Sequence, residues 1–514
     1  MLRRLMLKSL FAGLVFGLPA SANAAGAAAD FRFYAEGGGI DAGIAEMTRR
    51  VADGPDDADA TFALGALLFF SAVEGVQQDL YRLGAGNSGP GDGLSGLIPV
   101  FRIPAPPNPD PEPASYEKTR LMLAKFEKGL HAAEAVLAKV GERPTKLELD
   151  LARVALDANA DGTIQDFERI GARMAILPGA RVGKSQHSHM LFAFDNADAS
   201  WLRGYANLLS AFADFMLAFD YEPTYDASFH AVFGNQSTHY GRVLAELGSE
   251  KLIGARAELE RLLERKKQED TQLSEQLHPL RTELAEIAVD KTMAFEAKLR
   301  RQQEIERQIR RIEFAHKREY GREIGQVCDR IGQLGGHAPA DCDGISHSEF
   351  FLSRSIFDLV GFVHSISWRV VEPERLAQCR LALLEVARLN RQTWRLAQAE
   401  TDDDREWLPN PGQKGPFPGL AVTGARIEAW LAAVGLAEQV LNGEKLLPAA
   451  HAGGAGINLR RFFETADSFD LVAFIVGPGS VDYREFGEIA DPAAFRAITR
   501  PLAGKFGEFA IWFN

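Results

Sequence analysis

The segment with the clearest chemical pattern in this 514-residue chain runs from Asp157 to Glu168. It follows the order D-x-[DN]-x-[DN]-G-x5-E, which is typical of a calcium-binding loop. Calcium is a hard cation that takes about six to eight oxygen ligands, and Gly162 stands where such a loop turns sharply with a positive φ. The pattern predicts a calcium site, and its expected ligands are Asp157, Asn159, Asp161, Thr163, Gln165 and Glu168.

The expected ligands would hold the ion in different ways. Thr163 would offer its backbone carbonyl, Gln165 would act through a water molecule, and Glu168 would contribute both carboxylate oxygens. Residues 146–156 and 166–175 carry apolar side chains at helical spacing, which predicts one helix before the loop and one after it. The stretch thus resembles the EF-hand superfamily, and the resemblance implies calcium at these positions without implying an activity.

Two other groups of residues could serve a metal site or an active site. His187 and His189 precede Asp195 and Asp198, and all four have side chains that can bind a metal. Farther along the chain, residues 402–406 form an acidic run. The simpler interpretations are that one aspartate caps a helix and that the acidic run is a solvated loop.

Three further motifs do not support a site. Residues 341–349 have the residue types of a second calcium loop, but Pro339 stands at the first ligand position and the acid arrives one position early. Residues 179–185 and 84–89 resemble phosphate-binding loops, yet each follows a predicted helix, so no nucleotide site is expected. The hydrolase motifs G-x-S-x-G and H-E-x-x-H are absent from the sequence, which weakens an enzymatic interpretation.

The first 24 residues have the pattern of an export signal. Arg3, Arg4 and Lys8 flank the start of a short apolar run, and Ala22-Asn23-Ala24 fits a cleavage site. The pattern fits a general secretory (Sec) signal, and the paired arginines also fit the twin-arginine route. We expect a periplasmic or secreted protein whose mature chain begins near Ala25. No transmembrane segment is expected in it, because no later stretch reaches about 18 apolar residues.

Composition narrows the classes of function. The formal charge is −13, and removal of the first 24 residues, with three basic and no acidic side chains, would take it to −16. So acidic a chain repels phosphate backbones, and nucleic-acid binding is not expected. Three cysteines exclude a disulfide framework. Cys328 and Cys342 flank a Gly-rich turn and could form one bridge, whereas Cys379 is expected to be a buried thiol.

Helical periodicity dominates the mature sequence, so we predict a mainly α fold with a multi-helical core domain. The predicted helices cover residues 58–81, 116–140, 201–219, 350–371, 373–398 and 423–441. Residues 86–113 are rich in Gly and Pro and should cross the surface in extended form. Near the C-terminus, residues 469–476 and 508–513 are short and apolar, which permits a small pair of strands.

Between residues 250 and 327 the composition shifts to charged residues and Gln, with sparse Leu and Ile. The apolar residues recur at intervals of three and four, as in a short heptad seam. They are Leu273, Leu277, Leu280, Leu284, Ile287, Ile305, Ile309 and Ile312. We predict an antiparallel, coiled-coil-like arm, with Pro279 as a kink or a restart. The arm would divide a helical domain into residues 25–249, with the EF-hand at 146–176, and residues 328–514.

These patterns predict an exported, calcium-binding helical protein in which calcium has a structural role. The arm, the acidic surface and the missing hydrolase motifs favour a binding or scaffold protein of the cell envelope, with a protein partner at the arm. The alternative is a calcium-dependent periplasmic enzyme with a pocket near Asp195–Tyr205 or at the acidic run of residues 402–406.

Overall fold

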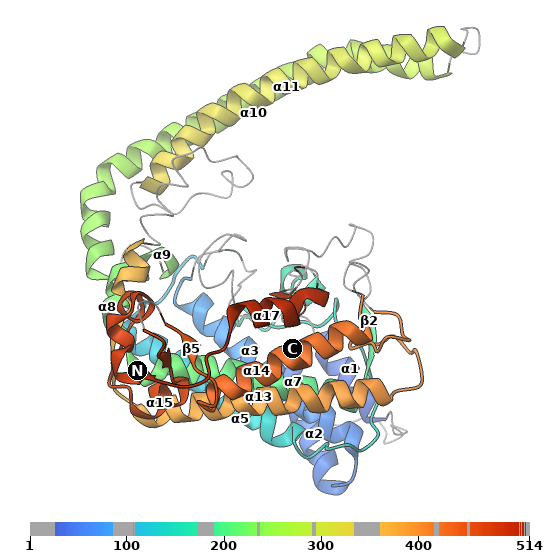
Figure 1. Cartoon of the computed structure of the whole chain (residues 1–514). Helices are drawn as coiled ribbons and strands as arrows, with labels where there is room; N and C mark the ends of the chain where they lie inside the picture. The colour runs from blue at the N-terminus through green and yellow to red at the C-terminus, as the bar shows by residue number, and fades with distance from the viewer. Residues whose placement is uncertain are drawn as a thin grey trace, which may run out of the picture.

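The computed structural model shows a mainly α-helical chain with three small antiparallel sheets among the described residues, and so confirms the predicted fold class. A core of packed helices carries a long helical arm (Figure 1). The structure describes residues 26–85, 106, 108–171, 190–233, 237–289, 295–333, 360–415, 421–449, 453–502, 504, 506, 507 and 509. The predicted export signal and most of the Gly- and Pro-rich segment lie outside these residues.

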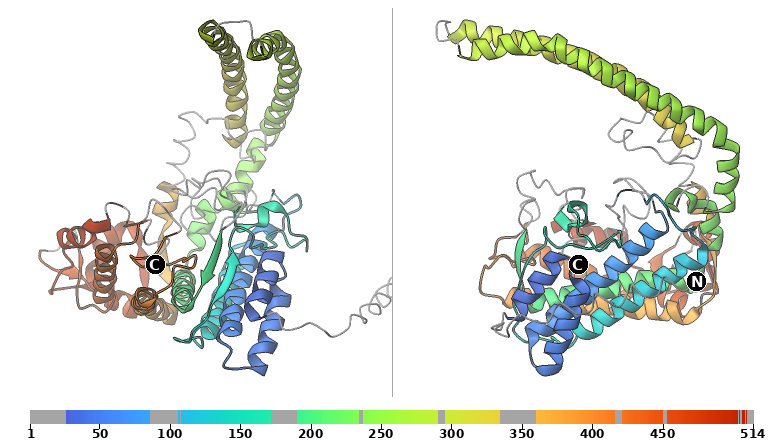
Figure 2. Two further views of the ribbon diagram at one scale, coloured as in Figure 1. Left: turned by 90° about the vertical axis from the view of Figure 1, so that its right-hand side faces the viewer. Right: turned by 180° about the vertical axis from the view of Figure 1, so that it is seen from behind.

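The core is a row of helices in which α2, α3, α5, α7, α13 and α14 pack in that order, with α1 against α2 and α3 (Figure 2). Their bounds are α1 (Ala27–Gly37), α2 (Ile40–Asp53), α3 (Ala58–Arg82), α5 (Tyr116–Leu137), α7 (Asn196–Ala218), α13 (Pro373–Ala399) and α14 (Gly424–Leu441). Five of the predicted helices are therefore confirmed, with small shifts at their ends. They correspond to α3, α5, α7, α13 and α14.

The core helices begin at polar caps and bury apolar faces. The Asp57 side chain accepts a hydrogen bond from Ala60 N at the start of α3, and Ser115 accepts one from Lys118 N at the start of α5. By length and composition α3 could cross a membrane, but 67% of its most apolar window is buried inside the fold. Such burial is expected of a central core helix.

The helix predicted over residues 350–371 is wrong at its end. Residues up to 359 lie outside the described part of the chain, and Ser367–Val370 forms strand β4. This strand pairs with β3 (Phe219–Asp220) on one side and β7 (Ser468–Asp470) on the other. The pairing buries Trp368, whose ring packs against Phe219 of β3 and against Tyr221, so tertiary packing overrides the helical spacing.

The strand predicted over residues 469–476 is wrong beyond Asp470. Leu471–Val476 forms helix α16 because the Asp470 carboxylate caps its first turn, accepting from Ala473 N at 2.7 Å. A three-stranded sheet does lie nearby, built from β5 (Leu447–Pro448), β6 (Gly456–Ile457) and β8 (Arg484–Glu485). Most of residues 508–513 lie outside the described part. The other short helices are α8 (Glu222–Ser228), α9 (His230–Phe233), α15 (Leu459–Thr465) and α17 (Pro492–Thr499).

The predicted arm is present as two long helices, α10 (His239–Val289) and α11 (Phe295–Gln333), which project from the core (Figures 1 and 2). The helices are antiparallel, because their ion pairs join residues that become closer in sequence toward the tip. These pairs are Glu258 with Arg330, Arg265 with Glu323, Arg281 with Glu313, and Glu283 with Arg301. Pro279 lies within α10, and the helix continues past it.

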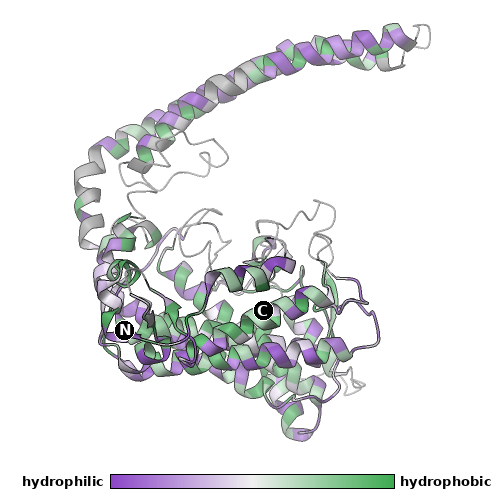
Figure 3. Ribbon diagram, in the orientation of Figure 1, coloured by the Kyte–Doolittle hydropathy of each residue, from purple (hydrophilic) through white to green (hydrophobic). Residues whose placement is uncertain are grey.

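The arm is held together by a narrow apolar seam inside a hydrophilic surface (Figure 3). Leu277 and Ile305 are buried at its centre, as the heptad pattern predicts. At the base, a separate apolar cluster includes Cys328, which is disulfide-bonded. Its predicted partner Cys342 lies outside the described residues. Cys379 on α13 is free and buried, and burial raises the pKa of its thiol to about 12.

We expect the core to fold without the outer arm, because the arm has its own apolar seam. Replacement of residues 266–322 by a short Gly-Ser linker would keep the Arg265–Glu323 pair and the apolar cluster at the base. The shortened protein should keep a cooperative thermal transition within about 3 °C of the parent. A matched Leu277→Asp variant should disrupt the arm alone. Aggregation or a non-cooperative transition in the shortened chain would show that the arm is integral to the core.

Candidate functional site

The predicted calcium loop is entered from a strand, so the helix predicted over residues 146–156 is wrong. Leu147–Asp150 forms β1, which pairs in antiparallel register with β2 (Leu191–Phe194). Leu147 and Leu149 are buried, whereas Glu148 between them is half-exposed. This alternation of buried and exposed residues matches a half-buried strand. The sequence fits either a helix or a strand here, and pairing with β2 favours the strand.

The loop leaves through a short turn. Asp166–Glu168 forms a single 3-10 turn, which is closed by a capping box between Gln165 and Glu168. Helical backbone resumes at residues 170 and 171, and the rest of the predicted exit helix lies outside the described residues. The predicted helix–loop–helix unit is therefore replaced, in the described residues, by a strand, a loop and a short helical turn.

The polar side chains of the loop fold back over its own backbone. Asp157 accepts hydrogen bonds from Asp161 N at 3.2 Å and from Gly162 N at 2.9 Å. Asn159 Oδ1 accepts from Asp161 N at 3.0 Å, and Asp161 Oδ1 accepts from Thr163 N at 2.7 Å. The sharp turn predicted at Gly162 has φ +77°. Three of the expected ligands therefore present side-chain oxygens around one tight turn.

Glu168 closes the loop from the other side. Its side chain is fully buried, with Oε1 accepting from Ala158 N at 2.9 Å and Oε2 from Gln165 N at 2.8 Å. The carboxylates of Asp157, Asp161 and Glu168 do not all lie within 4.8 Å of one another. The donor set has the all-oxygen chemistry that suits calcium, but Glu168 must turn away from these N–H groups to complete the shell.

Helix α3 holds the start of the loop. Glu74 Oε1 accepts from Asp157 N at 2.7 Å, and Gln78 Nε2 donates to Asp157 O at 2.8 Å. Burial is the main cause that raises the pKa of Glu74 to about 7, and the charges of Asp157 and Glu168 raise it further. The core therefore holds acidic groups close together at this point, despite their mutual repulsion.

Helix α1 and the turn after it hold the rest of the loop. Ala155 N donates to Ala35 O at 3.1 Å, and Arg169 Nη1 donates to Glu36 O at 3.1 Å. Ile164 packs on Gly38, where an added Cβ would lie 2.3 Å from Ile164 Cγ1. In the described part of the chain, the loop of residues 157–168 is thus supported by the helical core.

Gly38→Ala should destabilise the protein by about 2–4 kcal/mol, because Gly38 has φ +74° and an added methyl group would overlap Ile164. Denaturant unfolding with a constant m-value would measure this loss. Gly37→Ala is the matched control, because a Cβ there meets nothing within 4 Å. Equal stability of the two variants would contradict the proposed packing of Ile164 on Gly38.

The two acidic segments that are far apart in sequence meet at a second place. Asp195, Glu400 and Glu406 each offer a carboxylate oxygen, and the three oxygens lie within 4.8 Å of one another. Asp195 caps α7, as predicted, by accepting from Ala197 N at 2.7 Å. Asp198 completes this capping box by accepting from Asp195 N at 2.9 Å. Of these residues, Glu400 carried no signal of its own in the sequence.

Ion pairs clamp the acidic run onto β1. Lys146 Nζ donates to Asp402 at 2.8 Å and to Asp404 at 3.0 Å, and Arg405 pairs with Glu148. These contacts bring the following residue, Glu406, against the end of β2 and the start of α7. The acidic run is therefore a docked loop, and basic side chains neutralise its Asp402 and Asp404.

Burial and like charges shift the titration of this second group. Burial, followed by the charge of Asp195, raises the pKa of Glu400 to about 9. Burial also raises the pKa of Asp198 well above its ordinary value, and that of Glu406 in the same direction. Carboxylates so close together cannot all ionise without a compensating positive charge.

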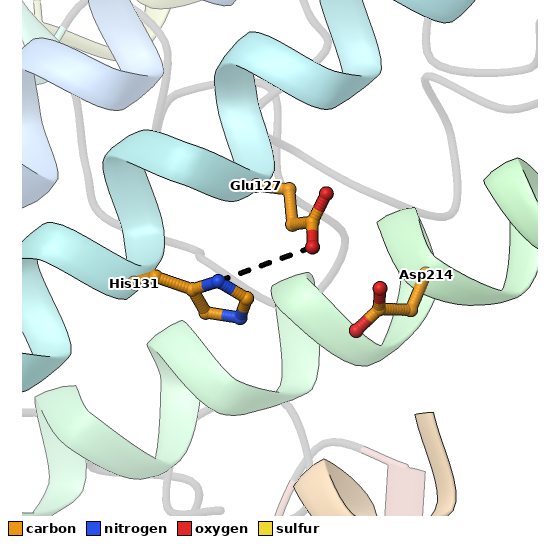
Figure 4. Close-up of side chains that lie close together, drawn as sticks. All are labelled: Glu127, His131 and Asp214. Atoms are coloured by element: carbon orange, nitrogen blue, oxygen red, sulfur yellow. Dashed lines mark ion pairs between the residues drawn. The ribbon is translucent and has the colours of Figure 1, made fainter. Parts of the chain in front are cut away.

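A third acidic group lies between the core helices (Figure 4). Glu127 and His131 project from α5 and Asp214 from α7, with His131 Nδ1 3.9 Å from Glu127 Oε1. Arg375 of α13 donates through Nη1 to Glu127 at 2.7 Å and to Asp214 at 3.0 Å. Its guanidinium already supplies the positive charge here, so this group is a structural ion-pair network.

Comparisons with known proteins do not assign a family. No protein-family model, no curated protein and no solved structure matches the chain. The resemblance of residues 157–168 to the EF-hand superfamily therefore remains a prediction from the motif. The other candidates, His187, His189 and residues 179–185 and 341–349, lie outside the described residues.

Proposed function

We propose that this protein is an exported, calcium-binding scaffold in which one calcium ion fastens the loop of residues 157–168 to the helical core. One observation carries the proposal: three of the expected ligands, Asp157, Asn159 and Asp161, present side-chain oxygens around a tight turn that α1 and α3 support. An ion bound there would be linked to several core elements, so its role would be structural.

All the expected ligands belong to this short segment. Asp157, Asn159, Asp161, the Thr163 carbonyl, Gln165 and Glu168 would hold the ion. Bound calcium would supply positive charge among the carboxylates of Asp157, Asp161 and Glu168 and the neighbouring Glu74, which the fold holds close together. Backbone hydrogen bonds orient these acids before the ion arrives, and Glu168 would need a new side-chain conformation.

Calorimetric titration of the full chain with calcium tests the proposal. Glu168→Gln should remove one binding site, because the amide cannot supply two anionic oxygens, and magnesium should bind much more weakly than calcium at this site. Asp166→Asn is the matched control, since Asp166 is an exposed acid within the same loop and is not an expected ligand. Unchanged calcium binding in Glu168→Gln would refute the site.

The scaffold role rests on the arm, which offers a long hydrophilic surface to a partner (Figure 3). Capture of envelope proteins by the parent chain but not by the shortened-arm variant would support it. Export is tested separately, by mass spectrometry of the mature N-terminus, which we expect near Ala25. The alternative is an enzyme with a pocket near Asp195–Tyr205, where the carboxylates of Asp195, Glu400 and Glu406 meet.

A further inference from the structure

We propose that a second hard divalent cation binds between Asp195, Glu400 and Glu406, next to the buried carboxylate of Asp198. The ion would tie the loop after α13 to the start of α7. This site is separate from the loop of residues 157–168 and does not depend on it.

The first argument is the geometry of the three carboxylates. Oxygens that share one calcium ion each lie about 2.3–2.6 Å from it, so two of them are at most about 5 Å apart. The oxygens of Asp195, Glu400 and Glu406 meet this limit. The donors come from three segments: the cap of α7, the end of α13 and the acidic run. An all-oxygen, anionic donor set selects calcium, magnesium or manganese over softer metals.

The second argument is an unpartnered buried oxygen. Asp198 is 2% exposed, and its Oδ1 has no hydrogen-bond partner among the described residues. Its other oxygen accepts from Asp195 N, and the charges that act on Asp198 are those of Asp195, Glu400 and Glu406. A buried carboxylate oxygen without a partner is costly, and a cation between Asp195, Glu400 and Glu406 would offset its negative charge.

The third argument is that no ion pair among the described residues neutralises this group, although the charge of Lys146 acts to lower the pKa of Glu406. In the described part of the chain, no Lys or Arg forms an ion pair with these four acids, because Lys146 and Arg405 are taken up by Asp402, Asp404 and Glu148. The group formed by Glu127 and Asp214 differs, since Arg375 supplies its positive charge. Two acidic groups of the same fold therefore have different means of neutralisation.

Glu406 is 4% exposed, and a cluster of aromatic rings follows it in the chain. Trp407 follows Glu406 directly and packs edge-on against Trp201 at 5.8 Å between ring centroids, and against Phe192 at 5.2 Å. Limited access to water strengthens the attraction between a bound cation and the carboxylates. Trp407 is the residue after Glu406, so its indole provides a spectroscopic probe.

Titrations of the full chain with calcium and with manganese test the proposal. The parent should bind two calcium ions, and Glu400→Gln/Glu406→Gln should lose the second one, with affinity there reduced by about 100-fold or more. Asp403→Asn is the matched control: it removes an acid of the same run that accepts a hydrogen bond from Lys414 N and lies outside the proposed site. It should leave both ions bound.

Thermal melting separates a cation site from acids that merely share protons. In chelator, the double Gln variant should melt at or above the parent, because repulsion among the acids is relieved. Added cation should raise the melting temperature of Glu168→Gln through the second site, and should no longer do so when the two Gln substitutions are added. If added cation raises the melting temperature equally with and without the two Gln substitutions, the proposal is overturned.

Terbium luminescence excited through tryptophan places the ion. Sensitised emission should fall in Trp407→Phe while the calorimetric affinity for calcium stays unchanged, and the second-site emission should vanish in the double Gln variant. A parent that binds only one calcium ion, lost in Glu168→Gln, would refute the second site and leave the first intact. A parent that binds only one calcium ion, lost only in the double Gln variant, would support the second site and refute the site in the loop of residues 157–168.

Discussion

Removal of calcium should lower the melting temperature of the full chain by about 2–5 °C, and Glu168→Gln should reproduce the part of this loss that is due to the loop of residues 157–168. A ligand that binds only the folded state stabilises it by about 2.7 kcal/mol per site when its free concentration is a hundredfold above Kd. In a chain of this length each kcal/mol shifts the transition by only about 1 °C. Differential scanning calorimetry in calcium and in chelator would measure the shift.

The control for this experiment is Asp166→Asn, which should respond to calcium as the parent does. In Glu168→Gln, the remaining response should come from the second site alone, and it should disappear when Glu400 and Glu406 are also replaced by Gln. If chelation leaves the melting temperature of the parent unchanged, calcium has no structural role. If calorimetry detects calcium binding but calcium does not change the melting temperature, calcium likewise has no structural role.

Arg375→Met should destabilise the core by about 3 kcal/mol or more. Arg375 is the shared partner of Glu127 and Asp214, whose side chains are 11% and 1% exposed. Removal of one partner from a buried ion pair costs about 3–5 kcal/mol, because it leaves uncompensated charge in the core. Arg388→Met on the same helix is the control, because its pair with Glu385 is exposed and should contribute no more than about 1 kcal/mol.

The loss in Arg375→Met should also depend on pH. Burial, followed by the charge of Glu127, raises the pKa of Asp214 to about 7, while the hydrogen bond and charge of Arg375 act to lower it. The folded protein therefore keeps a proton that the unfolded chain releases near its ordinary pKa. The stability contributed by this proton is present at acidic pH and is lost as pH rises toward 7.

Without the guanidinium, the pKa of Asp214 should rise further, so the loss of stability should extend to higher pH. Urea unfolding at pH 5 and pH 8 would compare the two conditions, and the variant should lose more stability relative to the parent at pH 8. An equal loss at both values would show that Arg375 acts by packing and not by charge.

Local sequence patterns predicted most of the helices. They are also the basis for every ligand that we expect in the loop of residues 157–168. The faces of α3, α5 and α7 follow from apolar residues three and four apart, and either Asp195 or Asp198 was expected as a helix cap. The seam of the arm follows from the same spacing, with Leu277 and Ile305 buried at its centre. Such features depend on neighbours within a few residues, so a single sequence contains them.

Other features could not be predicted because they require contacts between distant segments. Residues 147–150 fit a helix or a strand, and pairing with β2 decided for the strand. Residues 367–370 were predicted as part of a helix, and pairing between β3 and β7 likewise decided for a strand. Neither outcome is contained in the local spacing, since strand pairing gains its free energy from a partner elsewhere in the chain.

The sequence by itself determined which residues can bind a hard cation in one short loop, because their spacing along the backbone sets the turn. Only the tertiary structure decided that the loop rests on α1 and α3, and that Asp195 meets Glu400 and Glu406. It also decided that Arg375 neutralises one acidic group while another has no basic partner in the described residues. The physical reason is that burial and chain packing set the electrostatic environment of each acid, and residue order alone does not.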